Sequence, residues 1–359
     1  MLQISLPEVW RTYSIDLWVH LRPSLWKSAR VTAIFKSGER CNPNNYRPIT
    51  ILPVISKIFQ SAIHNQLYTY LNENKLISPN QFGFRPKLST AVALSHFTDN
   101  ILDKMDQGYF TDAIFLDLSK AFDTVDHQIL LDKLDSCGLD QNLIKWFHSY
   151  LNGRTQSTMV GKELSQPLPL TVGVPQGTIL GALLFLVYIN DISSCTLMSN
   201  LTLHADDTVL YTSTKNLKDL ENTLNSDWHV IFQWFQKNLL TLNFKCKFII
   251  FGSPQRLLKV QNTLLTFTIN NEVIERTDSF KYLGVTVNSI MSWSDHVDSI
   301  IKKINQRIGL ITRIKNLIPI TTRLTLYNSL IVPLFDYGDI IWGDKENITL
   351  MNHKYSKIK

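Results

Sequence analysis

The chain has 359 residues, of which 44% are hydrophobic, and a formal net charge of +6, so it is large enough to bury a sizeable core in one unit or in two to three smaller ones. Its four cysteines are scattered without a C-x-x-C pair, so neither a disulfide framework nor a zinc module is indicated and a reduced, intracellular compartment is favoured. The most apolar run, residues 178–189, is shorter than the roughly 20 residues that span a bilayer, and the N-terminus lacks a signal-peptide pattern. We therefore expect a globular protein without a membrane partner, in which this run is buried core.

Charge is distributed in three blocks along the chain. Residues 1–110 carry a net charge of +5, residues 111–214 a net charge of −6, and residues 215–359 a net charge of +7. An acidic centre between basic flanks suits a metal-dependent enzyme that binds a polyanion, with cations on the phosphates and carboxylates on the metal. Ordinary scatter of surface charge also produces such blocks, so this pattern alone leaves both interpretations open.

Regular patterns begin only after the first part of the chain, since residues 1–22 show no clear period and receive no assignment. Residues 29–38 read as a strand that ends in a glycine turn, and residues 41–50 as a polar loop that enters a second strand. After Pro53, apolar residues recur at helical spacing as far as Leu71. This spacing predicts an amphipathic helix of about five turns that buries its apolar face.

Further helices and strands are predicted in the rest of the chain. The patterns predict a helix at residues 90–105, a strand at residues 113–116 and a helix at residues 127–151. A hairpin that turns at Gly161 follows within residues 154–174, and a strand, tight turn and strand follow at residues 201–212. In the last part of the chain the patterns predict a helix at residues 217–235, strands at residues 248–251 and 280–287, and a final helix at residues 300–314. Segregated helices with a mostly antiparallel sheet indicate an α+β fold.

Acidic side chains follow two of the predicted strands. Asp117 ends one apolar run, and Asp206 and Asp207 lie together in the tight turn 89 residues further on. Three carboxylates that converge would supply hard oxygen ligands for two Mg²⁺ ions, the arrangement used for in-line displacement at phosphorus. A single aspartate more often caps a helix or a turn, so the prediction of phosphoryl transfer depends on the set.

Six motifs in a fixed order resemble the reverse transcriptase domain of non-LTR retrotransposons, most of all the jockey-type elements of animals. They are NPNNYRPIT, SPNQFGFR, FLDLSKAFDTVDH, GVPQGTILG, ADDT and FKYLGV, and the resemblance covers roughly residues 23–343. It implies a right-hand polymerase with an antiparallel palm sheet packed by helices. It implies fingers at residues 23–110, a palm with finger-like insertions at residues 111–292 and a thumb at residues 293–343. Residues 1–22 are an unassigned segment, and residues 344–359 are a tail.

The same resemblance implies an RNA-directed DNA polymerase, which transfers a nucleotide from a dNTP to a primer 3′-hydroxyl. The expected partners are an RNA template, a DNA primer and dNTPs, and the expected cofactor is a pair of Mg²⁺ ions, with Mn²⁺ as a substitute. By analogy with target-primed insertion, the expected location is the nucleus. Template, target site and oligomeric state do not follow from the sequence.

In this comparison Asp117 is similar to the first metal ligand, Asp206 to the second, and Asp207 to the third aspartate, near the primer end. Phe122 takes the position of the steric gate that excludes a 2′-hydroxyl, although periodicity alone favours a core aromatic there. Lys36 and Arg47 resemble the fingers cations that hold the triphosphate.

Two loops complete the implied site. Gln176 and Gly177 resemble the loop beside nucleotide and template, although the same residues also suit a turn formed for geometry alone. Lys281, Tyr282 and Gly284, in FKYLGV, resemble the primer-grip hairpin, in which Tyr282 has packing as its alternative role.

The chain departs from the family pattern in three places. His204 stands where the aromatic before A-D-D is usually Tyr or Phe, and Ala182 stands where many relatives have Pro. The motif LNFKCKF is one residue shorter than its usual form, so both Lys245 and Lys247 remain candidates for its lysine. These departures leave a second hypothesis open, a degenerate element copy that binds nucleic acid without catalysis. A two-metal nuclease and an aspartic protease, whose D-T-G signature is absent, are disfavoured.

Overall fold

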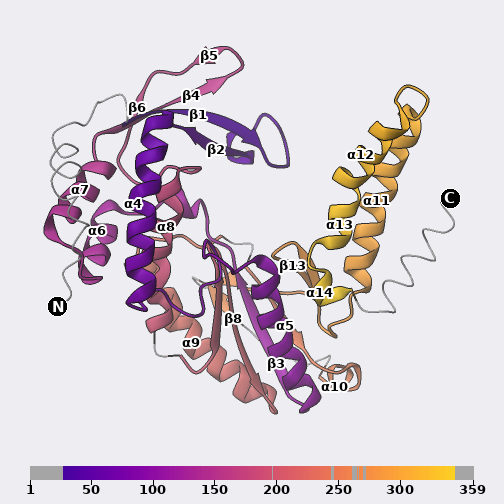
Figure 1. The fold of residues 1–359 in the computed structure, drawn as a ribbon. Helices are drawn as coiled ribbons and strands as arrows, with labels where there is room; N and C mark the ends of the chain where they lie inside the picture. Colours follow the sequence, from indigo (N-terminus) through magenta and orange to yellow (C-terminus); the bar gives the residue numbers. More distant parts are fainter. Residues whose placement is uncertain are drawn as a thin grey trace. The chain divides into compact units, whose positions relative to one another are not determined.

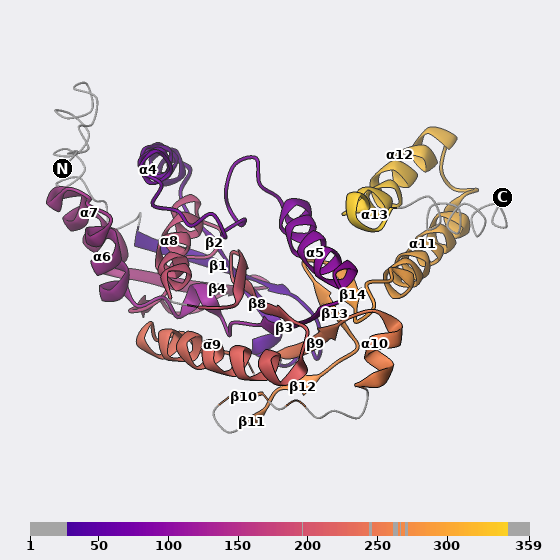
Figure 2. The same ribbon diagram turned by 90° about the horizontal axis from the view of Figure 1, so that it is seen from below.

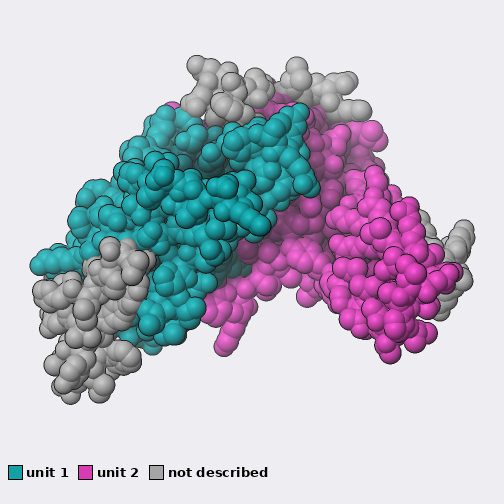
Figure 3. All heavy atoms as spheres, turned by 90° about the horizontal axis from the view of Figure 1, so that it is seen from above, with its two compact units in different colours: residues 1–84, 118–195, 231–242 teal, residues 85–117, 196–230, 243–359 magenta. Residues whose placement is uncertain are grey.

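The structure is a computed structural model that describes residues 27–343, apart from residue 196 and residues 244–245, 261–264, 266 and 270–271. These residues form an α+β fold that divides into two compact units (Figure 3). Unit 1 comprises residues 1–84, 118–195 and 231–242, and unit 2 comprises residues 85–117, 196–230 and 243–359. Each unit is therefore assembled from three separate stretches of the chain.

Unit 1 contains a five-stranded sheet with one parallel and three antiparallel neighbours. Its strands are β1 (Ser28–Phe35), β2 (Tyr46–Ile51), β4 (Arg154–Val160), β5 (Glu163–Leu164) and β6 (Leu168–Leu170). β1 pairs antiparallel with β2 and parallel with β4, and β4 pairs antiparallel with β5 and β6. Ala29 and Val31 of β1 are buried and Arg30 between them is exposed, the alternation that a half-buried strand requires.

The helical part of unit 1 contains one apolar helix. The helices are α4 (Val54–Glu73), α6 (His127–Ser136), α7 (Gln141–Leu151) and α8 (Ile179–Ile189), with the 3-10 helices η1 (Pro43–Asn45), η2 (Ala121–Asp123) and η3 (Asn190–Ser194) (Figure 1). In α8 every residue from Leu183 to Ile189 is buried, and the helix packs against α4 and α6. The prediction that residues 178–189 form buried core is confirmed.

Residues 127–151 form two helices rather than the single predicted helix. Asp126 caps the start of α6 by accepting hydrogen bonds from the backbone of Gln128 and Ile129. The chain then turns at Gly138, whose φ is +80°, and Asp140 caps α7 in the same way. The continuous apolar spacing concealed this break because both helices bury leucine and aromatic residues at helical intervals.

In the first half of α4 the burial is the reverse of the prediction. Val54, Ile55 and Ile58 are 73%, 59% and 65% exposed, whereas Ser56 and Gln60 are buried. The buried face is polar because Gln60 donates to the Ser56 hydroxyl (3.1 Å) and accepts from the Tyr150 hydroxyl (3.3 Å). The helix was predicted correctly, but the face that its first half buries was not.

Unit 2 is built on a second five-stranded sheet, in the order β12, β9, β3, β8, β7. The bounds are Glu275–Arg276 for β12, Lys247–Phe251 for β9, Phe110–Leu116 for β3, Asp207–Thr214 for β8 and Asn200–His204 for β7. All neighbours are antiparallel except β12 and β9. β3 is buried along its whole length, as expected for a central strand that is covered on both faces.

Helices flank this sheet, and α5 and α9 lie on opposite sides of β3 and β8 (Figure 2). The remaining elements of unit 2 are two small hairpins and a helical C-terminal part. Their bounds are α5 (Thr90–Asp106), α10 (Pro254–Lys259), β10 (Thr268–Ile269), β11 (Glu272–Val273), β13 (Ser279–Tyr282), β14 (Val285–Asn288), α11 (Ser294–Ile314), α12 (Ile320–Leu330), α13 (Val332–Asp336) and α14 (Asp339–Trp342). Helix α9 (Leu217–Lys237) begins in unit 2 and continues into unit 1. No helix among the described residues is long and apolar enough to cross a membrane.

An aromatic cluster joins the sheet of unit 2 to its neighbours. The Phe97 ring of α5 lies 5.9 Å from Phe115, 5.3 Å from Tyr211, 6.1 Å from Phe251 and 5.3 Å from Tyr282, centroid to centroid. All four contacts are edge-to-face, the geometry that aromatic rings prefer in cores. Helix α5, three strands of the sheet and the β13–β14 hairpin are thereby fixed to one another.

The two units cut across the boundaries predicted for fingers, palm and thumb. Residues 85–110 were assigned to the fingers, yet α5 belongs to unit 2 because it packs on β3. Residues 118–195 were assigned to the palm with its finger-like insertions, and they belong to unit 1. The predicted segment 280–287 is the hairpin β13–β14 rather than one strand, as the resemblance implied. The three-part division itself remains a proposal.

Candidate active site

Strand pairing in unit 2 brings two of the predicted acidic residues to the same end of adjacent strands. β3 and β8 are antiparallel, with Leu116 opposite Thr208. Asp117 is the residue after Leu116, and Asp207 is the residue before Thr208. Because both side chains leave the sheet at one end of neighbouring strands, residues 90 apart in the sequence become neighbours in the fold.

Asp206 lies in the turn that joins β7 to β8. His204 pairs with Asp207, so the loop has two residues, Ala205 and Asp206. Ala205 has a φ of +58°, a conformation that costs an L-residue roughly 1–2 kcal/mol and that usually selects glycine. The predicted strand, tight turn and strand are confirmed, and the turn that holds Asp206 is strained.

Asp117 is held by Asn243, which lies just before β9. The Asn243 backbone N–H donates to the Asp117 carbonyl oxygen (2.7 Å), and its Nδ2 donates to the Asp117 Oδ2 (3.0 Å). β9 is the other neighbour of β3, with Lys247 opposite Phe115, so the chain before β9 runs beside the chain after β3. One carboxylate oxygen of Asp117 therefore has a fixed partner within the protein.

The donor chemistry of these residues suits Mg²⁺, although the described residues contain no group of three or more His, Cys, Asp or Glu side chains arranged to hold a metal. Asp117 and Asp206 are half-buried and Asp207 is exposed. Mg²⁺ in phosphate-transferring enzymes is bound by one or two carboxylates together with substrate phosphates and water, rather than by a complete cage of protein ligands. Two carboxylates at one strand end and a third in the adjoining turn fit that mode of binding.

His204 is half-buried at the end of β7, directly before the strained turn. Burial lowers the pKa of His204 below its ordinary value, and the nearby charge of Asp206 only partly opposes this shift. The imidazole is therefore neutral near pH 7. It is planar and uncharged, like the aromatic residue whose position it takes.

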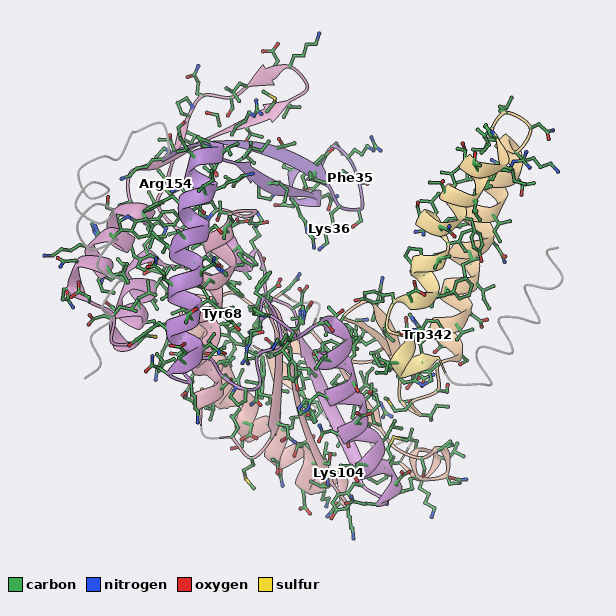
Figure 4. The ribbon with its side chains drawn as sticks, in the orientation of Figure 1. Phe35, Lys36, Tyr68, Lys104, Arg154 and Trp342 are labelled. Atoms are coloured by element: carbon green, nitrogen blue, oxygen red, sulfur yellow. The ribbon has the colours of Figure 1, made fainter. Side chains whose placement is uncertain are left out.

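In unit 1, Lys36 and Arg47 lie on one face of the β1–β2 hairpin. Arg47 pairs with Ile34, and Lys36, two residues after Ile34, donates its backbone N–H to the Asn45 carbonyl oxygen (2.8 Å). The two cations are therefore diagonal neighbours on the same side of the sheet. Both residues are exposed, and Figure 4 shows Lys36 beyond the end of β1.

Phe122 is half-buried in η2 and is packed between two other rings. It stacks on Phe185 of α8, with centroids 4.5 Å apart, and meets the edge of Phe84 at 6.1 Å. One side of the ring is thus fixed by the core, while part of it stays accessible. This arrangement is compatible with both predicted roles, the gate and the core aromatic.

The loop of Gln176 and Gly177 lies against β2. The Gln176 carbonyl oxygen accepts from the Thr50 backbone N–H (2.9 Å), and its side-chain Nε2 donates to the Asp123 carboxylate (2.9 Å). Gly177 has a φ of +82°, and a Cβ there would lie 3.3 Å from Ile49. The positive φ favours glycine here, and a Cβ would require the Ile49 side chain to shift by a few tenths of an ångström. Burial raises the pKa of Asp123, and the Gln176 hydrogen bond lowers it by less.

The β13–β14 hairpin of unit 2 turns through Leu283 and Gly284, which both have positive φ, +44° and +87°. A type I′ turn has this pattern. Tyr337 covers the turn, because its hydroxyl donates to the Leu283 carbonyl oxygen (2.7 Å) and a Cβ on Gly284 would lie 2.9 Å from its ring. Of the two predicted primer contacts, Lys281 is exposed, whereas Tyr282 is only 3% exposed.

Tyr282 therefore has a packing role in this structure. Its ring contacts Phe97 and Phe115, and its hydroxyl is buried without a hydrogen-bond partner among the described residues. Burial raises the pKa of Tyr282 far above its usual range, and the negative charge of Asp207 adds a smaller increase. The hairpin is thus linked electrostatically to the acidic strand end.

Comparison with known proteins agrees with these observations. The family described as reverse transcriptase (RNA-dependent DNA polymerase) matches residues 34–287. The chain belongs to this family. Among curated relatives, it is 27% identical to the probable RNA-directed DNA polymerase from transposon BS and to the RNA-directed DNA polymerase from mobile element jockey, both of Drosophila melanogaster. The alignments cover 92% and 89% of this chain and 37% and 36% of those proteins, so this reverse transcriptase chain spans little more than a third of their length.

Solved structures show the fold. Telomerase from Candida tropicalis, in complex with a TWJ fragment of telomeric RNA, has a TM-score of 0.52 and 12% identity, covering 92% of this chain and 57% of that chain. The apo telomerase has a TM-score of 0.51 and 13% identity, covering 81% and 50%. The predicted α+β fold of a right-hand polymerase is confirmed.

Sequence reasoning did not find three partners of the site residues. Asn243 lies in a quoted motif but was given no role, Asp123 was not linked to Gln176, and Tyr337 was not linked to the β13–β14 turn. Each pair is far apart in the sequence, and hydrogen bonds of this kind leave no periodic signal. Of the two candidate lysines, Lys247 forms an ion pair with Glu275 (3.1 Å), and Lys245 lies outside the described residues.

Proposed function

We propose that the chain is the polymerase part of an RNA-directed DNA polymerase of a non-LTR retrotransposon. It would extend a DNA primer with dNTPs on an RNA template, and it would act in the nucleus. The observation that best supports the proposal is the strand register that brings Asp117 beside Asp207, with Asp206 in the adjoining turn. Membership of the reverse transcriptase family supports the reaction type.

In this proposal Asp117 and Asp206 hold two Mg²⁺ ions, which Mn²⁺ could replace, and Asp207 lies at the primer end. Bound Mg²⁺ would lower the pKa of the primer 3′-hydroxyl and stabilise charge on the attacking and leaving oxygens. The protein contributes orientation. The pairing of β3 with β8 positions Asp117 and Asp207, the β7–β8 turn positions Asp206, and the Asn243 hydrogen bonds hold Asp117.

The nucleotide would be bound by residues of unit 1. Lys36 and Arg47, on one face of the β1–β2 hairpin, would contact the triphosphate, with arginine suited to bidentate contact. The accessible part of Phe122 would exclude a 2′-hydroxyl, because its stacking on Phe185 prevents the ring from moving away. Gly177 allows close approach of a backbone to the nucleotide, and Gln176 would face the template.

The primer–template duplex would be bound in unit 2. Lys281 on β13 is exposed beside Gly284 of the turn, and Lys303 and Arg307 lie on α11. Partial burial, and then the neighbouring charges of Lys281 and Arg307, lower the pKa of Lys303. Cations that repel one another in the free protein are stabilised by a polyanion, which supports nucleic acid as the ligand.

Primer extension on poly(rA)·oligo(dT) with Mg²⁺ and dTTP tests this proposal. We expect the chain to extend the primer and Asp206→Asn to abolish extension while duplex binding is retained. Binding without extension by the unaltered chain would contradict the proposal and select the degenerate copy. Extension that persists in Asp206→Asn would show that another residue serves as the metal ligand.

A further inference from the structure

Asn243 is the nearest hydrogen-bonding partner of the first candidate metal ligand, and its two contacts form a clamp. The backbone N–H of Asn243 fixes the Asp117 main chain (2.7 Å), and its side-chain Nδ2 fixes one oxygen of the Asp117 carboxylate (3.0 Å). A carboxylate held at Oδ2 by a planar amide has a restricted χ rotation, which leaves its Oδ1 side for another ligand.

The main chain at Asn243 is itself fixed by the residues that follow it. The Asn243 main-chain carbonyl oxygen accepts hydrogen bonds from the Cys246 backbone N–H (3.4 Å) and from the Cys246 thiol (3.2 Å). Cys246 is buried and directly precedes β9, whose pairing with β3 sets the position of the whole segment. The clamp thus rests on the central sheet.

The chemical type of the clamp also matters. An amide donor satisfies one carboxylate oxygen without adding charge, so the carboxylate keeps its full attraction for a cation. A lysine or arginine at this place would neutralise the acid, and an apolar residue would leave its orientation unfixed. Partners that orient a metal ligand in this way typically account for 10- to 100-fold in metal affinity or activity.

We propose that Asn243 is a positioning residue that orients the Asp117 carboxylate for divalent metal. The inference rests on the proposed function, in which Asp117 is a metal ligand. It assigns to Asn243 an effect on metal affinity that is separate from any effect on duplex binding.

The test measures metal binding directly. The full chain is bound to a primer–template that ends in a dideoxynucleotide, the next dNTP is added, and free Mn²⁺ is followed by electron paramagnetic resonance during titration. Asn243→Leu, which keeps the size and the backbone N–H but loses the donor, is expected to weaken Mn²⁺ binding by about 10- to 100-fold. Raising Mg²⁺ should restore its extension rate, and duplex affinity should not change.

The matched control is Asn190→Leu, because Asn190 also bridges backbone groups, donating to the Leu76 carbonyl oxygen (2.7 Å) and accepting from the Ser78 N–H (2.8 Å). It should leave Mn²⁺ affinity unchanged. If Asn243→Leu does not fold, Asn243→Ser replaces it, since a serine hydroxyl is too short to reach Asp117 and the same weakening is expected.

Asp117→Asn separates the two proposals. If this change weakens Mn²⁺ binding and the Asn243 variants bind Mn²⁺ like the unaltered chain, the clamp is overturned and the proposed function stands. If Asp117→Asn has no effect on Mn²⁺ binding, the metal role of Asp117 is overturned and the clamp with it.

Discussion

Phe122 is fixed on one side by stacking on Phe185 and remains partly accessible on the other. If its accessible edge is the gate, Phe122→Val opens space for a 2′-hydroxyl, and we expect the ratio of ribonucleotide to deoxyribonucleotide incorporation to rise by about 10- to 200-fold. Single-nucleotide primer extension with rUTP and dTTP measures this ratio. Phe35→Val, which alters a ring that packs on Tyr46 in the β1–β2 hairpin, is the control and should leave it unchanged. A ratio that does not rise in Phe122→Val would assign the ring to the core.

Asp112 in the middle of β3 is fully buried, and neither carboxylate oxygen has a hydrogen-bond partner among the described residues. Burial raises the pKa of Asp112 well above its usual range, and the charge of Arg276 opposes this only in part. The unfolded chain releases the Asp112 proton above a pH of about 4, whereas the folded protein keeps it. The free energy of unfolding therefore falls as the pH rises above the pKa that Asp112 has in the unfolded state.

We therefore expect Asp112→Val, which has a similar volume, to raise the free energy of unfolding by about 1–3 kcal/mol. The gain should be larger at pH 7.5 than at pH 5.5, with urea unfolding as the measurement. Asp227, also buried, accepts hydrogen bonds from the backbone of Met198 (3.0 Å) and Ser199 (2.6 Å), so Asp227→Val should destabilise. A loss of stability in both variants would mean that Asp112 has a favourable partner in solution.

At the scale of elements, α4 shows that a helix can be correctly predicted and wrongly oriented. Ile58 is exposed, and Gln60 is buried in hydrogen bonds to Ser56 and Tyr150. We expect Ile58→Lys to change the free energy of unfolding by no more than about 0.5 kcal/mol. Gln60→Leu should lower it by about 1–3 kcal/mol, because the Tyr150 hydroxyl loses its acceptor. Chemical denaturation of both variants measures these changes. A larger loss of stability in Ile58→Lys than in Gln60→Leu would show that the apolar face is the buried one.

The elements that carry the site were predictable where one local pattern decided them. Alternation around Asp206 and Asp207 predicted the β7–β8 hairpin, and the apolar run before Asp117 predicted β3. The inverted face of α4 was not predictable, because it depends on polar partners from other elements. The hydrogen bond between Asn243 and Asp117 joins residues 126 apart, and only the pairing of β9 with β3 brings them together. For Tyr282 the sequence allowed either a primer contact or a packing role, and only its burial in the fold favours packing.

At the scale of the whole molecule, the chain passes repeatedly between the two units. A cut between residues 195 and 196 separates β3 from both of its neighbours, β8 and β9. We expect residues 1–195 alone to be insoluble, since the apolar strand β3 would be unpaired, and co-expression with residues 196–359 to restore soluble protein. A cut after Gly161, at an exposed hairpin tip, should be tolerated. Size-exclusion chromatography checks both, and a folded monomer of residues 1–195 would contradict the prediction.

One passage between units comes directly after Asp117 and another directly before Asn243, the two residues that share the carboxylate hydrogen bond. Neither unit is encoded by one continuous stretch, so a chimaera that exchanges a unit with a relative must graft three pieces of gene. Two of its seams would fall directly on the acid and its amide partner. We therefore expect such a chimaera to keep the hydrogen bond between Asp117 and Asn243 intact only when both seams come from the same parent.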